Sequence, residues 1–543
     1  MSELDFPKKT ERGSALIWFR HGLRLHDNPA LHEALKDCSQ FYAVFIFDGE
    51  SAGTKLVGYN RMKFLLESLA DLNDQLERRG GKLYLLKGTP STIFKRLHEE
   101  VGLAKICFEQ DCEPIWKERD NSVKTTCEEL GMKCVEKVSH TLWDPKEIIQ
   151  TNGGKPPLTY QLFIETVPLI GEPRRPVQDV EWTNIKFGIL PDHLLDEFEA
   201  FSSIPSPEAF GLEPEVKDKS PVVRWIGGET HALHQLTKRL QVEENAFKNG
   251  VYLPNQANPD LIGPPTSLSA ALRFGCLSVR RFYWEIHDVW MKIRGKDCPP
   301  SDSITGQLIW REYFYTMSVD NPFYAEMERN PICLTIPWVD DDENLQKWAK
   351  GETGYPFIDA SMRQLLLEGW IPHAARNAVA CFLTRGDLWI SWEKGLSVFL
   401  YHLLDADWSV CAGNWMWVSS SAFERLLDCT MCVSPVSYGR RLDPWGTYIK
   451  RYVPELSGFP PEYIHEPWKA PIVVQESAGC IIGHDYPERI VDHAVASKRN
   501  QKYMEAIRNS LMSDFPAPHC CPSNEDETRH FLMMDDAEID HVH

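Results

Sequence analysis

The amino-acid sequence predicts an α/β domain with a doubly wound parallel sheet, followed by an all-α domain. Three observations support this fold class. The chain has 543 residues, which is too long for one ordinary hydrophobic core. Residues 14–138 alternate short apolar runs with amphipathic stretches, a pattern typical of strand-helix units whose parallel sheet is covered on both faces. From residue 228 to about 509 the strand pattern almost disappears and helical periodicity replaces it.

Five short runs predict the strands of the sheet, because they are apolar, rich in β-branched or aromatic residues and bounded by chain breakers. These runs are Ala15–Phe19, Phe41–Phe47, Lys82–Leu86, Lys105–Phe108 and Lys133–Val138. Helices are expected between them. Two helices should begin at Asn28-Pro29 and Thr89-Pro90, where a capping side chain precedes a proline at the first helical position.

Ten prolines between residues 152 and 221 interrupt any regular pattern. Each proline removes a backbone donor, so this segment is expected to be a long connector that wraps over the surface. The expected limits are 1–150 for the α/β domain, 151–221 for the connector, 222–512 for the helical domain and 513–543 for a short tail. Within the helical domain, Thr266-Ser267 and Asp359 are expected to cap helices.

Composition limits the classes of function. The chain carries 78 acidic and 58 basic residues, a net charge of −20 that repels phosphates, so strong nucleic-acid binding is not expected. The 15 cysteines are scattered, and Cys429 and Cys432 have no second pair to complete a zinc site, so no metal site is expected. No signal peptide or membrane-spanning stretch is evident, which predicts a soluble intracellular protein.

Fourteen of the 18 tryptophans lie in the predicted helical domain, where most are expected to fill the core. Trp389 and Trp392 are spaced i, i+3, which predicts that they share one helical face. A second cluster, Trp408, Trp415 and Trp417, follows closely. Indole rings lined up toward a redox cofactor could pass an electron, although spacing alone favours simple packing.

Six segments resemble, in the same order, the photolyase and cryptochrome superfamily. They are residues 16–31, 309–314, 353–363, 383–385, 405–417 and 441–450, and the resemblance runs from about residue 14 to 510. It implies an antenna-type α/β domain, a connector and a helical domain that binds FAD. It also explains why no Gly-x-Gly-x-x-Gly fingerprint follows the first strand, since FAD in this family lies folded between helices.

The resemblance implies two groups of FAD contacts. Thr266, Ser267, Leu268 and Ser269 match positions at the diphosphate, where hydroxyls and amides at a helix start offer donors to an anion; Thr-Ser is also a plain helix cap. The matched flavin-pocket positions are Gln307, Trp310, His373, Arg376, Asp405 and Asp407. Arg376 and Asp405 resemble the salt bridge beside the isoalloxazine ring.

Cys411 matches the position that faces flavin N5, where plant cryptochromes have aspartate and photolyases asparagine. A thiol is a poor proton source at neutral pH, so an anionic semiquinone is expected to persist, as in the insect light-sensing group. The alternative is a small buried filler. The matched electron route begins at Trp415 and continues through Trp392 and Trp338, with Trp389 as its outermost member.

Two further departures bear on activity. His373 keeps one of the two histidines that (6-4) photolyases use, but Asn377 occupies the place of the other and cannot shuttle a proton. We therefore expect no catalytic turnover in DNA repair and assign His373 to a redox-linked switch. In the tail, Phe531, Leu532 and Met533 are expected to dock in the groove that photolyases use for DNA, although a solvated terminus is the default and the family's tryptophan is absent.

Taken together, these features resemble the light-sensing cryptochromes of insects. The implied function is a blue-light photoreceptor of the circadian clock, in which photoreduction releases the tail and promotes partner binding and degradation. The implied partners are Timeless-type clock proteins and a ubiquitin ligase, with localisation in cytoplasm and nucleus. The alternatives are a (6-4) photolyase and a light-independent transcriptional repressor.

Overall fold

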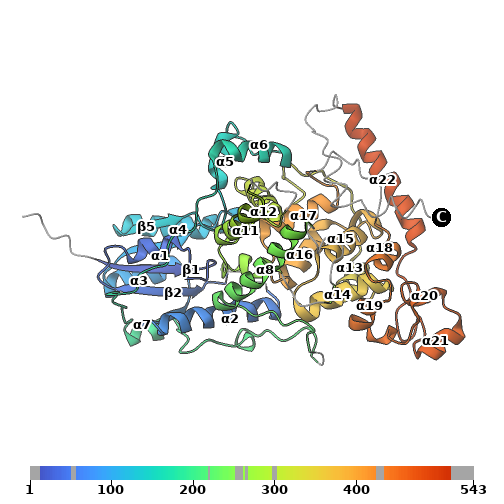
Figure 1. Cartoon of the computed structure of the whole chain (residues 1–543), viewed down its shortest axis with the longest axis horizontal. Helices are drawn as coiled ribbons and strands as arrows, with labels where there is room; N and C mark the ends of the chain where they lie inside the picture. The colour runs from blue at the N-terminus through green and yellow to red at the C-terminus, as the bar shows by residue number, and fades with distance from the viewer. Residues whose placement is uncertain are drawn as a thin grey trace, which may run out of the picture.

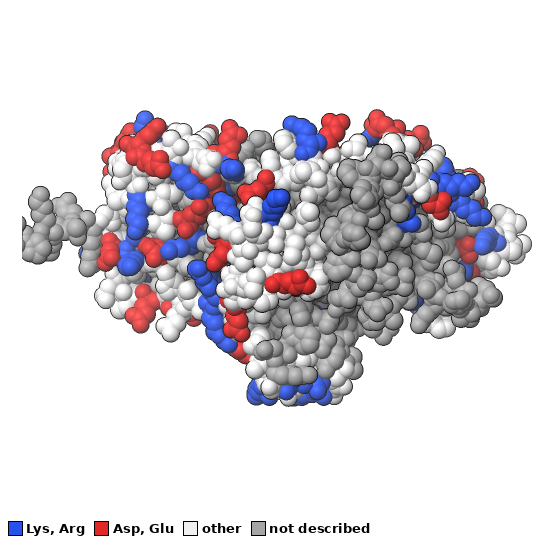
Figure 2. Space-filling model, turned by 90° about the horizontal axis from the view of Figure 1, so that it is seen from above, with Lys and Arg blue, Asp and Glu red and all other residues white. Residues whose placement is uncertain are grey.

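The computed structural model describes residues 13–49, 57–217, 220–250, 261–262, 267–295, 303–423 and 433–514, with side chains up to residue 509. A sheet-containing domain occupies one end of the molecule and a helical domain the other (Figure 1). The predicted fold class is confirmed. On the face shown in Figure 2, acidic and basic side chains are intermixed over the described part of the sheet-containing domain.

The sheet has five parallel strands in the order β3-β2-β1-β4-β5. The strands are β1 (Ser14–Phe19), β2 (Phe41–Phe47), β3 (Leu83–Lys87), β4 (Leu103–Glu109) and β5 (Lys133–Lys137). All five predicted strands are present, and their ends differ from the predicted ones by at most two residues. Alternate side chains of β1 enter different cores: Ile17 and Phe19 join the large central core, whereas Leu16 and Trp18 join a separate cluster on the opposite face.

Helices cover the sheet where the sequence predicts them. They are α1 (Pro29–Leu35), α2 (Tyr59–Glu77), α3 (Pro90–Val101) and α4 (Lys117–Glu129). Asn28 caps α1, because its Oδ1 accepts a hydrogen bond from the backbone N–H of Leu31 at 3.0 Å. Thr89 stands at the N-cap of α3, but its side chain makes no capping bond. The predicted start of α3 is therefore confirmed, while the predicted side-chain cap is wrong.

The proline-rich connector is more structured than its composition indicates. It contains α6 (Tyr160–Ile170), α7 (Asp192–Glu197) and the 3-10 turn Pro207–Phe210, and α5 (Pro145–Thr151) precedes it. Its backbone also bonds to the sheet, since Phe201 N donates to Leu85 O at 3.0 Å and Lys87 N donates to Phe198 O at 2.9 Å. The connector thus covers the edge strand β3, which would otherwise expose unpaired backbone groups.

The second domain is helical, and the part that the structure describes contains only isolated β-bridges. Its helices are α8 (Glu229–Asn249), α10 (Ser269–Arg273), α11 (Val279–Arg294), α12 (Thr305–Ser318), α13 (Asp342–Lys350), α14 (Pro356–Glu368), α15 (His373–Cys381), the π-helical turn η5 (Phe382–Gly386), α16 (Trp392–His402), α17 (Trp408–Val418), α18 (Pro435–Leu442), α19 (Thr447–Tyr452), α20 (Pro461–Ile464), α21 (Ile472–Ala478) and α22 (His493–Asp514). Asp359 does not cap a helix. It lies inside α14, where its buried carboxylate accepts from the N–H groups of Thr353 and Gly354.

Helices α16 and α17 pack closely because Gly395 has no side chain. A Cβ at this position would lie 2.3 Å from the ring of Trp415. The same holds for Gly413, where a Cβ would lie 2.3 Å from Phe314 of α12. These two contacts fix α17, which begins immediately after the predicted flavin-site aspartates.

Candidate functional site

The loop between α16 and α17 carries Asp405 and Asp407, and cationic side chains hold its backbone in place. Arg61 of α2 donates to the carbonyl oxygens of Leu403 and Ala406 at 2.8 and 2.9 Å, and Arg273 of α10 donates to Ala406 O at 2.8 Å. Both guanidinium groups are buried. The loop is therefore fixed from two domains before any ligand is considered.

Asp405 is the centre of a polar set that also contains Arg376, Ser267 and Ser269. Its Oδ2 accepts from Ser269 Oγ at 2.6 Å and from Arg376 Nη2 at 2.8 Å. Burial would raise the pKa of Asp405, but Arg376, through its charge and its hydrogen bond, and the Ser269 bond outweigh burial and lower it. The carboxylate is therefore ionised at neutral pH.

One atom of this polar set has an unused bonding capacity. Asp405 Oδ1 is buried, and no group in the described part of the chain donates a hydrogen bond to it. A buried ionised oxygen without a donor is costly, so a donor from a bound molecule fits this position. The predicted salt bridge between Arg376 and Asp405 is present. Asp405 Oδ1, which the salt bridge does not use, fits a hydrogen-bond donor of the FAD that the sequence resemblance implies there.

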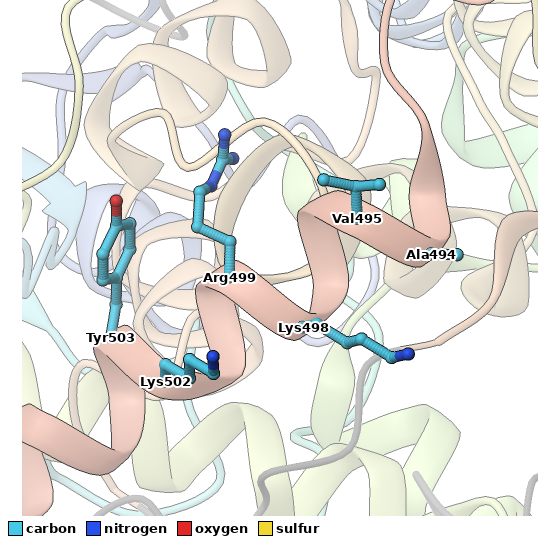
Figure 3. A pocket seen from close by; sticks show the side chains of 6 residues that line it. All are labelled: Ala494, Val495, Lys498, Arg499, Lys502 and Tyr503. Atoms are coloured by element: carbon cyan, nitrogen blue, oxygen red, sulfur yellow. The ribbon is translucent and has the colours of Figure 1, made fainter.

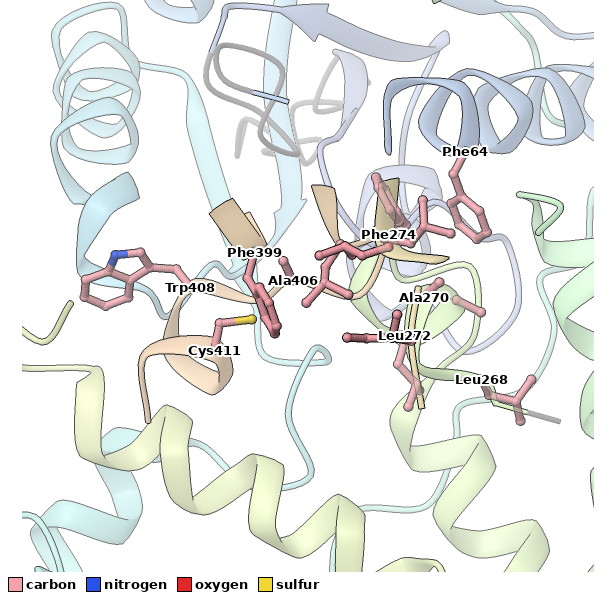
Figure 4. Close-up of a cluster of buried hydrophobic side chains, with 14 of the residues drawn as sticks. Phe64, Leu268, Ala270, Leu272, Phe274, Phe399, Ala406, Trp408 and Cys411 are labelled. Carbon is pink, nitrogen blue, oxygen red and sulfur yellow. The ribbon is translucent and has the colours of Figure 1, made fainter. Parts of the chain in front are cut away.

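The start of α10 supplies hydroxyl groups to the same place. Ser267 Oγ and Ser269 Oγ are 2.9 Å apart, and Ser269 N donates to Ser267 Oγ at 3.3 Å. The N-cap residue Leu268 is buried among apolar side chains and makes no side-chain cap (Figure 4). Ser269 thus bonds Asp405 directly, whereas Ser267 bonds the hydroxyl and the backbone N–H of Ser269. Thr266, which the sequence also assigns to the diphosphate, lies outside the described residues.

Asp407 has a different environment from Asp405. Its carboxylate lies 3.1 Å from Arg273 Nε, 3.9 Å from Arg311 Nε and 4.0 Å from His140 Nε2. His140 belongs to the α/β domain, so these charges lie where the two domains meet. We call Asp407, Arg273, Arg311 and His140 the interface charge network. Within the described contacts, Asp407 belongs to this network and not to the polar set around Asp405.

His140 of this network also lies near His21 and Glu109, and these three buried side chains are close enough to share a metal ion. His21 Nδ1 lies 3.1 Å from Glu109 Oε1, and its Nε2 lies 3.1 Å from Asp111 Oδ2. Burial lowers the pKa of His21, but the two carboxylates outweigh burial and raise it overall. A protonated imidazole offers no lone pair to a metal, so the three residues form an ion-pair cluster.

Cys411 lies on α17, one turn after Asp407, and its backbone N–H donates to Asp407 O at 2.9 Å. Its side chain is buried and is drawn near Phe399, Ala406 and Trp408 in Figure 4. Burial raises the pKa of the thiol to about 12. The thiol therefore keeps its proton at neutral pH, in agreement with the prediction that it is a poor proton donor.

His373 is the first residue of α15, and Asn377 lies one turn further along the helix, with Nδ2 3.4 Å from His373 Nε2. The imidazole is accessible to water, yet enough protein surrounds it that desolvation, followed by the charge of Arg376, lowers its pKa to about 4. At neutral pH this ring is uncharged. It is therefore a group that can take up a proton when a negative charge develops nearby.

Two predicted pocket residues stand apart from the polar set. Gln307 is exposed on α12. Trp310 stacks on Tyr160 of the connector helix α6, with ring centroids 3.6 Å apart and planes 4° from parallel, and it meets Trp417 edge-on at 5.2 Å. The described contacts thus assign Trp310 to an aromatic cluster that joins α6, α12 and α17.

The predicted electron-route tryptophans are all in the helical domain and mostly buried. Trp415 and Trp392 are 3% and 0% exposed, and Trp338 meets Trp389 with ring centroids 4.7 Å apart. The prediction that Trp389 and Trp392 share a helical face is wrong. Trp389 lies in a turn with φ 59°, and α16 begins only at Trp392.

Sequence reasoning missed the arginines and the histidine of the interface charge network, and it missed Arg61. Their signal is weak, because each lies far along the chain from Asp407. Arg311 alone carried a signal, since it lies in one of the segments that resemble the family. The tail residues Phe531, Leu532 and Met533 lie outside the described residues.

Comparison with known protein families accounts for both domains. Residues 15–178 match the DNA photolyase family, and residues 304–506 match the FAD binding domain of DNA photolyase. The chain therefore belongs to the photolyase and cryptochrome family, and FAD is the cofactor of its helical domain.

Individual relatives are similar over nearly the whole length. The chain is 57% identical to Cryptochrome-1 of Aedes aegypti, covering 96% of this chain and 98% of that protein. It is 56% identical to Cryptochrome-1 of Drosophila melanogaster, covering 97% and 99%. A bacterial class III photolyase from Agrobacterium tumefaciens has a similar structure, with a TM-score of 0.76 at 28% identity over 94% of this chain and all of that one. A Synechocystis cryptochrome shares the fold, with a TM-score of 0.77 at 24% identity over 90% and 99%.

In the described parts of the chain, every helix is too short or too polar to span a bilayer.

Proposed function

We propose that this chain is a blue-light photoreceptor of the circadian clock and that it does not repair DNA. Its similarity to insect proteins named Cryptochrome-1 supports the proposal. The observation that carries it is the pair His373 and Asn377, because an amide stands within 3.4 Å of the imidazole where repair needs a second proton carrier. Acid-base chemistry on a DNA lesion therefore lacks one of its two groups.

Bound FAD supplies the absorption of blue light and accepts an electron. Arg376, Asp405, Ser267 and Ser269 would hold and orient it, and Asp405 Oδ1 would be available to accept a hydrogen bond. Cys411 keeps its proton on Sγ and does not deliver it, because burial raises the pKa of the thiol.

We assign the supply of the electron to Trp415, Trp392, Trp338 and Trp389. An indole is the side chain best suited to this role, because it is readily oxidised and tolerates burial. The ring contact between Trp338 and Trp389 supports the outer part of this route. No described ring contact joins Trp415 to Trp392, so the inner part is proposed from the family resemblance.

We further propose that His373 converts the electronic change into a structural one. Its imidazole is uncharged at rest, and a negative charge nearby raises its proton affinity. A new N–H donor there would rearrange hydrogen bonds and release the tail through Phe531, Leu532 and Met533. Partner binding and degradation follow, and the resemblance implies Timeless-type clock proteins and a ubiquitin ligase.

A DNA-repairing photolyase is the second candidate, because the matched family models and one structural relative carry that name. Blue light on the purified holoprotein should change the flavin spectrum, whereas a lesion-bearing oligonucleotide should remain unrepaired in light with pre-reduced flavin. Repair at the rate of a photolyase would overturn the proposal. A fluorescent fusion in insect cells should appear in both cytoplasm and nucleus.

A further inference from the structure

The proposed row of tryptophans does not end at the surface. Trp389, its outermost predicted member, is only 2% exposed. Its ring contacts two other rings. The centroid of Trp338 is 4.7 Å away, and that of Tyr503 of α22 is 5.2 Å away, with the ring planes of Trp389 and Tyr503 60° apart. Tyr503 is 45% exposed. The aromatic row therefore reaches water through a tyrosine.

Hydrogen bonds hold α22 against the turn that carries Trp389. Asn500 Nδ2 donates to the carbonyl oxygens of Gly386 and Asp387 at 3.1 and 3.2 Å, and Arg499 Nη2 donates to Asp387 O at 3.1 Å. The indole Nε1 of Trp389 donates to Pro337 O at 3.0 Å. These bonds hold the Trp389 ring and the part of α22 that carries Tyr503, so the fold keeps the two residues adjacent.

We propose that Tyr503 is the terminal electron donor of this row, an inference that rests on the proposed photoreduction. The oxidant is the one-electron-oxidised indole of Trp389. One electron passes from the Tyr503 phenol to Trp389, which returns to its neutral closed-shell form. At the same time the hydroxyl O–H of Tyr503 breaks, its proton goes to water, and a neutral tyrosyl radical remains.

The surroundings of Tyr503 favour this direction of transfer. A surface hollow beside it is lined by Lys498, Arg499 and Lys502, all on α22 (Figure 3). Nearby cationic side chains raise the energy of an additional positive charge, as on an oxidised indole. A tyrosyl radical carries no charge once its proton has left, and the exposed hydroxyl allows water to accept that proton.

The test uses the full-length holoprotein with two ways of oxidising the row. In the first, blue light acts on the bound flavin. In the second, azide radicals generated in the dark oxidise tryptophan directly and require no photochemistry. A nitroso spin trap captures the radicals, and mass spectrometry locates the adducts. Tyr463, a half-buried tyrosine of α20 without a described tryptophan contact, is the internal reference.

We expect adducts on Tyr503 in both experiments. In Tyr503→Phe, which keeps the ring packing, the adducts should move to Trp389 and Trp338. In Trp389→Phe, the yield at Tyr503 should fall while the yield at Tyr463 stays unchanged. Trapping on Trp389 without trapping on Tyr503, or a Tyr503 yield that ignores Trp389→Phe, overturns the inference. If azide radicals label Tyr503 through Trp389 but light leaves the flavin oxidised, the proposed photoreduction fails and the donor role of Tyr503 stands.

Discussion

Asp405 and Asp407 are separated by one residue and are about equally buried, with side chains 6% and 7% exposed, yet their carboxylates have different neighbours. Asp405 has one cationic partner, two hydrogen bonds and an oxygen left over. Asp407 is surrounded by charged groups from both domains. The comparison shows that burial alone does not identify a ligand-binding carboxylate. Oδ1 of each carboxylate lacks a hydrogen-bond donor in the described part of the chain. What separates the two is the charge around them, because Asp405 pairs with Arg376 alone, whereas Asp407 lies among Arg273, Arg311 and His140.

The largest expected effect comes from breaking the interface charge network. Asp407→Asn keeps the size of the side chain but leaves Arg273 and Arg311 buried with less compensation, which should cost about 3 kcal/mol of stability. The midpoint of thermal unfolding should fall while the folded protein keeps its FAD. Loss of FAD at an unchanged midpoint would show that Asp407 belongs to the ligand site after all.

Asp405→Asn is the matched variant on the other side of the comparison. It removes the charge that pairs with Arg376, and a charged hydrogen bond of this kind is worth about 2 kcal/mol, so FAD should bind at least about tenfold more weakly. The stability of the FAD-free protein should change little, since Arg376 is half-buried and water can solvate it. Equilibrium dialysis measures the affinity. Unchanged FAD retention would remove Asp405 from the site.

The two regions should also respond to pH in opposite directions. Glu312 lies beside the interface charge network, because its Oε1 is 3.0 Å from Arg311 Nη1. Burial raises the pKa of Glu312 to about 7, although Arg311 and two backbone N–H groups act to lower it. Its folded pKa exceeds the ordinary value near 4.5, so its contribution to stability is complete below about pH 4.5 and is lost as the pH rises through about 7. Asp405 has a lowered pKa, so its contribution is present above its ordinary value and is lost as the pH falls further.

Comparison of the native chain with Glu312→Gln isolates the pH-dependent contribution of Glu312 to the free energy of unfolding. Between pH 5 and pH 7.5 the native chain should lose about 1 kcal/mol or more relative to the variant, which has no carboxyl group to titrate. Denaturant unfolding at several pH values provides the measurement. Parallel pH profiles of the two proteins would contradict the assignment.

The smallest change in the free energy of unfolding is expected for Cys411→Asp, which should instead change the colour of the flavin radical. Cys411→Asp places a carboxyl group where burial holds a thiol proton with a pKa of about 12. A carboxylic acid releases its proton far more readily, so illumination should yield the blue, protonated flavin radical instead of the red, unprotonated one. Cys411→Ala is the control and should keep the red species. A red species in the aspartate variant would exclude this residue as the proton-controlling position.

The sequence predicted those features that depend on local periodicity. Five strands fell within two residues of their observed ends, because apolar runs bounded by breakers depend on neighbouring residues only. Trp389 shows the limit. Its i, i+3 spacing to Trp392 indicated one helix face, but a turn with positive φ and a backbone bond from Val339 to Trp389 separate them. That bond spans fifty residues, and no local pattern contains it.

The residues of the candidate site also divide into those that the sequence predicted and those that it did not. Arg376, Asp405 and the serines of α10 were identified through family resemblance and lie together. The different surroundings of Asp407 were not predictable, because they depend on Arg273 and His140, which come from other parts of the chain. In a loop without helical or strand period, sequence spacing carries no information about which way a carboxylate points.

Helix α22 has a mechanical consequence. It is anchored at Asn500 to the turn that carries Trp389, and it continues for fourteen residues to Asp514, about 21 Å further along its axis. A rigid helix that is anchored near its middle amplifies a small rotation at the anchor into a larger displacement of its far end. A tilt of about 5° at the anchored turn would carry the far end through about 2 Å, by the geometry of a rigid helix. A change too small to disturb the packed rings can therefore become a movement of the size of an atomic contact at the point where the tail begins.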